Sequence, residues 1–210
     1  MLNLDIVTFQ EFVMQESLPL STIHTAVLEF LRGRDDVVLF GAQAVNAYVS
    51  EPRMTQDIDL LSNRAAAFAE ELRTYLSQRF HIATRVREIG EGKGYRLYQV
   101  QKQGNRHLVD LRPVEHLPIA RRIEEILVMA PAELIASKVI AYVQRRGKPK
   151  AGTDWRDLAL LLLTFPDLKD ASSLVANCLE AADATPQIMA VWQELAAMEI
   201  SAEDDETEFE

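Results

Sequence analysis

The segment Arg53-Met54-Thr55-Gln56-Asp57-Ile58-Asp59-Leu60-Leu61 constrains the fold of this chain more than any other. Asp57 and Asp59 flank one apolar residue and precede two more, a pattern typical of a short buried strand over 57–61. Side chains two apart on a strand point to the same face, about 7 Å apart along the backbone. Two carboxylates placed in this way can bind one divalent cation or a pair of them. The alternative is a turn in which acidic and core residues happen to alternate.

The composition is that of a globular protein. Of 210 residues, 48% are hydrophobic and 26% are charged, which are ordinary values for a protein with a packed core. The sequence has no apolar run of about eighteen residues that would span a membrane. Its first residues lack the basic start of a secretory signal, and its single cysteine, Cys178, excludes an intramolecular disulfide. We therefore expect a cytoplasmic protein with no membrane partner.

The net charge of −10 argues against general binding to nucleic acids, but the charge is unevenly distributed. Residues 81–122 contain nine Lys/Arg and four acidic residues, whereas residues 154–210 contain two Lys/Arg and fourteen acidic residues. The basic middle segment is compatible with a polyanionic ligand held on one face. A solvated strand surface is the alternative.

The first 130 residues combine helices with strands. Helices are predicted over 8–16, over 21–32 with Ser21 as N-cap, over 42–49, and from an N-cap at Asn63 to about residue 80. Strands are predicted over 37–40, 57–61, 82–89, 95–101 and 107–111, with a further strand or edge segment over 125–129.

From Pro131, the first residue of a helix reaching about Arg146, the pattern is helical to residue 199. We therefore predict an α+β fold, in which a lobe over 1–130 with a short mixed sheet flanked by helices precedes a helical lobe over 131–200. Residues 201–210 are mostly acidic and are expected to form a disordered tail.

Gly41 and Asp110 extend the carboxylate pair into a candidate site. Gly41 lies between a predicted strand and a predicted helix, where backbone N–H groups and the helix dipole favour a phosphate, although glycine is also a common end to a strand. Asp110 is surrounded by apolar residues in a second strand, where a carboxylate is costly to bury unless it is paired or metal-bound. If the two strands are neighbours, the three acids form one cluster. The alternative is that Asp110 pairs with Arg96 or Arg112.

These segments resemble the signature of the polymerase-β-type nucleotidyltransferase superfamily. Gly-x-x-Ala from Gly41, followed by Arg-x-Thr-x-Asp-Ile-Asp-Leu from Arg53, is most similar to the AbiEii/AbiGii-like toxin nucleotidyltransferases. Residues 133–138 are similar to a helix that carries a nucleotide-facing lysine in those proteins, and residues 153–158 to their Asp-x-x-Asp-Leu motif. The resemblance covers residues 36 to 160.

The resemblance implies that the three acids hold Mg²⁺, with Mn²⁺ as the alternative ion. Asp57, Asp59 and Asp110 would be the metal ligands, and Asp110 would also be the candidate for activating the attacking hydroxyl. Lys138 would complete the catalytic set by neutralising phosphate charge, and the alternative is a lysine that simply faces solvent.

The resemblance also implies a nucleotide-binding set. Gly41 and Ala42 would let the backbone approach the triphosphate of the NTP, and Arg53 and Thr55 would position it. Ala42 departs from the Gly-Gly or Gly-Ser of the family, because alanine has no hydroxyl and does not easily take a positive φ. Asp154 and Asp157 would belong to the same site by ordering Lys138 or Arg156, or would only cap and decorate their helix.

The sequence therefore predicts a Mg²⁺-dependent nucleotidyltransferase that transfers NMP from an NTP to a hydroxyl and releases pyrophosphate. The expected acceptor is a macromolecule, either a tRNA 3′ end or a protein side chain, and the resemblance implies the toxin of a toxin–antitoxin pair, with an antitoxin protein as partner. One alternative is a non-catalytic module that keeps the fold and binds a partner. The other is a transferase for a small molecule such as an aminoglycoside, which would suit the acidic helical half.

Overall fold

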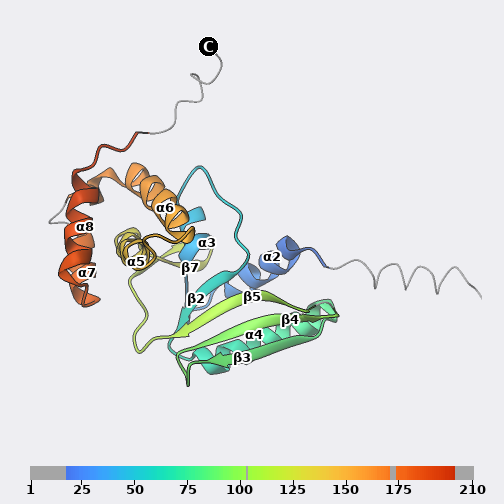
Figure 1. Ribbon diagram of the computed structural model, residues 1–210. Helices are drawn as coiled ribbons and strands as arrows, with labels where there is room; N and C mark the ends of the chain where they lie inside the picture. Colours follow the sequence, from blue (N-terminus) through green and yellow to red (C-terminus); the bar gives the residue numbers. More distant parts are fainter. Residues whose placement is uncertain (1–17, 103, 171–173, 202–210) are drawn as a thin grey trace, which may run out of the picture.

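The computed structural model describes residues 18–102, 104–170 and 174–201 (Figure 1). A mixed sheet of seven strands has the order β3-β4-β5-β2-β1-β7-β6. Its central strand β2 is parallel to β5 and antiparallel to β1, and β1 is parallel to β7. The strands are β1 (Val37–Phe40), β2 (Ile58–Ser62), β3 (Thr84–Ile89), β4 (Gly94–Gln101), β5 (Gly104–Pro113), β6 (Ala120–Ile123) and β7 (Ile126–Met129).

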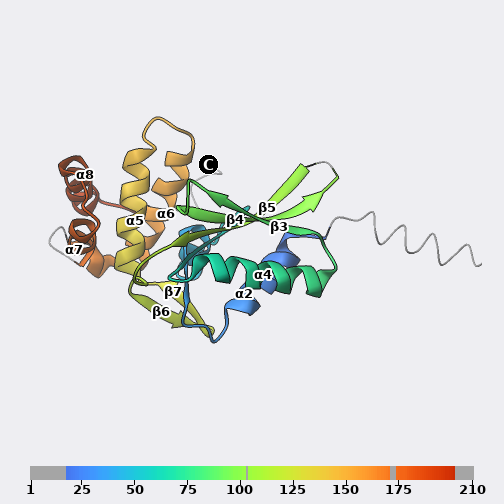
Figure 2. The ribbon, with the colours of Figure 1, turned by 90° about the horizontal axis from the view of Figure 1, so that it is seen from below.

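Helices α4 (Ala65–Phe80) and α2 (Leu20–Leu31) cover part of the sheet. Helix α4 runs along β3, β4 and β5, and α2 lies beside α4 and contacts β5 and β7 (Figure 2). Fully buried Phe68 and Leu76 of α4 and Ile58 and Leu60 of β2 belong to the same hydrophobic core. Because one face of β3–β5 is covered by α4, the functional side chains of these strands must project from the other face.

A group of helices follows β7. It comprises α5 (Pro131–Gln144), α6 (Lys150–Thr164), the 3₁₀ helix η1 (Pro166–Lys169), α7 (Leu174–Ala181) and α8 (Pro186–Ala197). The central helix α5 packs against α6, α7 and α8, and both α5 and α6 contact the short α3 (Gly41–Asn46). This contact joins the helical group to the sheet at the point where β1 ends. Within the described ranges, no helix is long and apolar enough to cross a membrane.

The predicted α+β class is confirmed, and most elements lie where the sequence places them. Two predicted caps are wrong: α2 begins at Leu20 with Pro19 at the N-cap position, and α4 begins at Ala65 with Arg64 there. Strand β6 was missed. The boundaries at 130 and 200 between lobes and tail stay predictions. The predicted helix over 8–16 and nearly all of the acidic tail lie outside the described residues.

Candidate active site

The cluster of carboxylates forms at the junction of β2 and β5. These strands are parallel, and Asp59 of β2 is in register with Asp110 of β5. Residues in register on neighbouring strands project from the same face, so the two carboxylates lie side by side. Asp57 directly precedes β2, which begins at Ile58, one residue later than predicted. The structure thus brings together the three acids that the sequence predicted.

Position 41 requires a glycine because the backbone there lies against the side chain of Asp59. Phe40, the last residue of β1, is paired with Asp59, so the next residue lies against the Asp59 side chain. A Cβ at position 41 would be 2.1 Å from Asp59 Oδ2, and the φ of Gly41 is +69°. Only glycine meets both conditions. Ala42 lies inside α3 and has no positive φ, so its departure from the family pattern does not strain the backbone.

Asp110 has two polar partners besides its carboxylate neighbours. Arg96 Nε donates to Asp110 Oδ1 over 2.8 Å, so one alternative pairing from the sequence coexists with the cluster. His107 places Nε2 3.3 Å from Asp110 Oδ1 and Nδ1 3.4 Å from Asp57 Oδ2. Burial acts to raise the pKa of Asp110, but the contacts with His107 and Arg96 outweigh it and lower this pKa below its usual value. The contact with Asp110 in turn raises the pKa of His107.

The segment that leads into Asp57 is fixed by side chains on both sides. The Asn46 side chain of α3 forms two hydrogen bonds with the backbone of Arg53. Its Nδ2 donates to the Arg53 carbonyl over 2.8 Å, and its Oδ1 accepts from the Arg53 N–H over 3.0 Å. Thr55 Oγ1 donates to the carbonyl of Asp57 over 2.8 Å. Thr55 therefore shapes the turn that presents Asp57.

Lys138 is buried, which rules out the alternative of a solvent-facing lysine. Its Nζ donates to Asp157 Oδ2 over 2.6 Å, and the residue is 7% exposed. Asp157 is fully buried and also accepts from Arg53 through Nε at 2.8 Å and Nη2 at 2.9 Å. One carboxylate of α6 thus holds a cation from α5 and a cation from the segment before β2. Asp157 orders Lys138, as one interpretation predicted, whereas Arg156 bonds the Glu51 carbonyl instead.

Asp154 holds a cation that the sequence analysis did not single out. Arg145 Nη1 donates to Asp154 Oδ2 over 2.7 Å, and Lys138 Nζ lies 3.6 Å from Asp154 Oδ1. Arg145 follows Lys138 by seven residues, which is two helical turns and the same face of the chain. This spacing was available in the sequence and predicts that both cations lie on one face of the helix; the structure shows that this face meets α6.

These side chains line one cavity of about 630 Å³ between the sheet and the helical group. All but one of the residues predicted for the site line it, namely Gly41, Ala42, Arg53, Thr55, Asp57, Asp59, Asp110, Lys138 and Asp154. Asp157 is not a lining residue and acts through the cations that it binds. Arg96, Arg112, Arg145 and Lys150 line the same cavity. A pocket with clustered carboxylates beside clustered cations suits a metal-bound polyphosphate.

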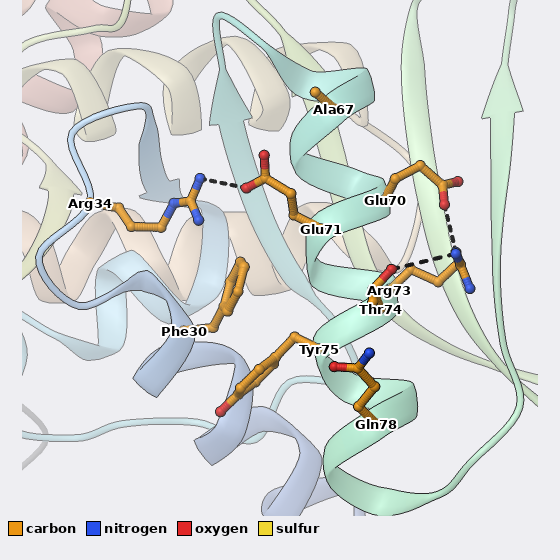
Figure 3. A pocket seen from close by; sticks show the side chains of 9 residues that line it. All are labelled: Phe30, Arg34, Ala67, Glu70, Glu71, Arg73, Thr74, Tyr75 and Gln78. Carbon is orange, nitrogen blue, oxygen red and sulfur yellow. Dashed lines mark hydrogen bonds and ion pairs between the residues drawn. The ribbon is translucent and has the colours of Figure 1, made fainter.

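A second hollow of about 720 Å³ lies on the outer side of α2 and α4 (Figure 3). Its charged groups bond one another: Arg34 donates to Glu71 and Arg73 donates to Glu70 (Figure 3). The Arg34 guanidinium also lies 5.0 Å from the centre of the Phe30 ring. Because these polar groups are paired and none of the acids described above is near, this hollow is not the candidate active site.

The carboxylates fit a divalent cation. Burial, followed by the negative charge of Asp57, raises the pKa of Asp59 to about 6. Like charges that repel in this way are stabilised by a cation between them, and carboxylate oxygens are the ligands preferred by Mg²⁺. Ligand atoms of Asp57, His107 and Asp110 also lie within 4.8 Å of one another. The donor set therefore fits the metal that the sequence predicted, while the choice of ion stays a prediction.

Known proteins are similar to this chain in family and in fold. The family model described as "Nucleotidyl transferase AbiEii toxin, Type IV TA system" matches residues 26–208. The fold is similar to that of the Megavirus polyadenylate synthase, with a TM-score of 0.58 and 14% identity over 78% of this chain and 36% of that one. This chain therefore spans about a third of the length of the viral protein. JHP933 from Helicobacter pylori is similar with a TM-score of 0.52 and 15% identity, over 84% of this chain and 87% of that one. No curated protein sequence matches the chain.

Proposed function

The chain belongs to the AbiEii family of nucleotidyltransferase toxins, and from this premise we propose that it transfers NMP from an NTP to a hydroxyl of a macromolecular acceptor. The carrying observation is the register of Asp59 with Asp110 beside Gly41, in the cavity that also contains Lys138. Pyrophosphate is the leaving group. Because the family description names a type IV toxin–antitoxin system, we also propose an antitoxin protein as partner.

Asp57, Asp59 and Asp110 are proposed to hold Mg²⁺ or Mn²⁺. The bound ion would supply positive charge to the transferring phosphoryl group. Asp110 is proposed as the carboxylate nearest to the attacking hydroxyl. Its strand β5 lies between β2 and the strands β4 and β3, where the acceptor is proposed to bind. His107 and Arg96 together lower the pKa of Asp110, and the hydrogen bond from Arg96 orients its carboxylate before substrate binds.

Lys138 and Arg53 are proposed to bind the triphosphate from the helical side. The ammonium of Lys138 has three N–H donors and uses one for Asp157, so donors remain for phosphate oxygens. Arg53 uses Nε and Nη2 for Asp157, which fixes its guanidinium at the wall of the cavity. Thr55 is proposed to position the triphosphate chiefly by shaping the turn beside it. Gly41 and Ala42 are proposed to let the phosphates approach the backbone.

A row of residues across the sheet supports an RNA acceptor, with the tRNA 3′ end as the first choice. Arg87 of β3 is in register with Arg96 of β4, which is in register with Asp110 and hence with Asp59. The row runs from exposed arginines at the sheet edge to the carboxylates. The next row contains Arg85, Tyr98 and His107. Cations and an aromatic ring on one face are suited to a single-stranded nucleic acid. A protein side chain is the second candidate acceptor.

The charge of the cavity disfavours a cationic drug as acceptor. Six cationic and four carboxylate side chains line it, and Asp154 is already bonded to Arg145. The acidic residues that suggested an aminoglycoside are therefore neutralised within the protein. The other alternative, a non-catalytic module, would not require three carboxylates packed together at an energetic cost.

The test is to incubate the protein with each labelled NTP and Mg²⁺, together with total tRNA, a protein lysate or an aminoglycoside panel. We expect label on tRNA, and loss of transfer by orders of magnitude in Asp57→Asn and Asp59→Asn. The thermal midpoint of both variants should stay within a few degrees, because removing one of several like charges relieves repulsion. Wild-type transfer rates in both variants would refute the carboxylate assignment.

A further inference from the structure

Strand β5 contains a bulge that changes the direction of one side chain. Leu97 of β4 pairs with Val109, but the next residue, Tyr98, pairs with His107, so β5 has one more residue than β4 between these pairs. Leu108 and Val109 are consecutive and both buried. In a regular strand, residues three apart point to opposite faces, so His107 and Asp110 would be separated. The bulge instead places both on the face with the carboxylates.

His107 lies between two of the proposed metal ligands. Its Nδ1 is 3.4 Å from Asp57 Oδ2, its Nε2 is 3.3 Å from Asp110 Oδ1, and the ligand atoms of all three residues lie within 4.8 Å of one another. The ring packs on Tyr98, with 5.2 Å between ring centres. Nε2 is buried and lacks a well-aligned hydrogen bond to any described residue. The imidazole therefore lies between the two carboxylates, with Nδ1 facing Asp57 and the unbonded Nε2 facing Asp110.

We propose that His107 is a nitrogen ligand of the catalytic cation, together with Asp57 and Asp110, and that it shifts the preference of the site from Mg²⁺ toward Mn²⁺. This inference rests on the proposed function because it uses the same carboxylates. Mg²⁺ is a hard ion that prefers oxygen ligands and keeps several waters. Mn²⁺ also binds oxygen ligands and is the weakest binder of the first-row divalent series. As a transition metal it nevertheless accepts an imidazole nitrogen more readily than Mg²⁺ does, so replacing one oxygen ligand by nitrogen should favour Mn²⁺ relative to Mg²⁺. Asp59, in register with Asp110 on β2, offers only oxygen.

The proposal is tested by metal binding in the nucleotide-free protein. Mn²⁺ affinity is measured from the electron paramagnetic resonance signal of the free ion, and Mg²⁺ affinity by competition. In the same samples, electron spin-echo modulation detects the ¹⁴N nucleus of a directly bound imidazole. The variants are His107→Asn and His107→Gln, whose longer amide keeps an oxygen within reach. The matched control is His116→Asn, because the His116 side chain is 89% exposed and, among the described residues, forms an ion pair only with Glu115.

We expect the ¹⁴N modulation in the wild type and in His116→Asn, and its loss in both His107 variants. Mn²⁺ affinity should fall about tenfold or more in His107→Asn, with a much smaller loss for Mg²⁺. Equal losses for both ions, or ¹⁴N modulation that survives in the His107 variants, would overturn the proposal. So would a wild type without ¹⁴N modulation or without Mn²⁺ binding.

Failure of the proposed function would look different. Asp57→Asn should lose both ions as well as nucleotidyl transfer. If Asp57→Asn binds both ions and transfers normally, the carboxylate site itself is wrong. A second outcome is that Asp57→Asn loses metal binding and transfer as expected while the ratio of Mn²⁺ affinity to Mg²⁺ affinity is the same in the wild type and in the His107 variants. In that case only the role of His107 is refuted. A thermal midpoint for each variant identifies any that does not fold, and His107→Gln then replaces His107→Asn.

Discussion

Replacing Asp157 by Asn should destabilise the protein more than most single substitutions. Asp157 is fully buried and accepts three hydrogen bonds, two from Arg53 and one from Lys138. The amide of Asn has no charge and one acceptor oxygen, so two cations lose their shared counter-charge. Breaking a buried ion pair by removing one partner costs about 3–5 kcal/mol.

The contacts that remain place this substitution near the lower end of that range. The Arg53 side chain is 23% exposed and can be partly hydrated, and Lys138 keeps Asp154 at 3.6 Å. We therefore expect a loss of about 3 kcal/mol in the free energy of unfolding. For a protein of this size, 1 kcal/mol changes the thermal midpoint by about 2–4 °C, so the midpoint should fall by about 6–12 °C.

The pH dependence gives an independent check. Burial acts to raise the pKa of Asp157, but the hydrogen bond from Arg53 and the charge of Lys138 outweigh it and lower this pKa below its ordinary value. The stabilisation is therefore fully present above the ordinary pKa of an Asp and is lost as pH falls through the lowered value. The difference between wild type and variant should be constant near neutral pH and narrow below about pH 4.

The assay is thermal and urea unfolding of Asp157→Asn between pH 3 and pH 7, with Asp167→Asn as the control. Asp167 is an exposed carboxylate in η1, just beyond α6, so its substitution should change stability by less than about 0.5 kcal/mol. A midpoint for Asp157→Asn within about 2 °C of wild type would refute the reasoning. A large loss that does not depend on pH would refute the assigned cause.

Three further predictions concern the carboxylates and the sheet face. Gly41→Ala should displace the Asp59 carboxylate and weaken both Mg²⁺ binding and transfer. The control is Gly152→Ala, whose new Cβ would meet nothing within 4 Å and which should leave both properties unchanged. Equal activity of the two variants would count against the contact between residue 41 and Asp59. Because the pKa of Asp59 is raised to about 6, the metal-free protein should lose stability as pH rises from about 4 to 6, and Asp59→Asn should lack this loss in urea titrations. Replacing Arg85 and Arg87 by Gln should weaken tRNA binding and reduce its log–log salt slope by about 0.7 per lost phosphate contact; an unchanged slope would favour a protein acceptor.

The sequence predicted the carboxylate cluster because its elements are local and strongly patterned. Asp57 and Asp59 precede an apolar pair, and Asp110 is embedded in an apolar strand, so each acid could be assigned to a strand or to the residue before it without knowing the fold. Their convergence depended on one further fact, the pairing of β2 with β5, which the sequence left open. The role of Gly41 was predicted as phosphate binding, whereas its contact with Asp59 appears only in the structure.

Long-range pairing explains what the sequence did not reveal. The bulge at Leu108 depends on how β4 and β5 align, so regular alternation along β5 would not bring His107 to the face of Asp110. Strand β6 contains Arg121 and Arg122 and gains its order by pairing with β7 at the sheet edge. The burial of Lys138 depends on α6 packing against α5, since a lysine is otherwise most often exposed.

The contact between Gly41 and Asp59 means that two separate sequence motifs form a single unit in space. Residue 41 follows the β1 residue that pairs with Asp59, so strand pairing alone brings the glycine to the carboxylate. The chain between Gly41 and Asp59 leaves the sheet and returns to it, and the contact between the two residues does not depend on the length of that chain. Related chains could therefore gain or lose residues between positions 47 and 52 while keeping the carboxylate in place. A search for distant relatives should accordingly allow a variable gap there, and require a strand pairing that sets glycine against aspartate.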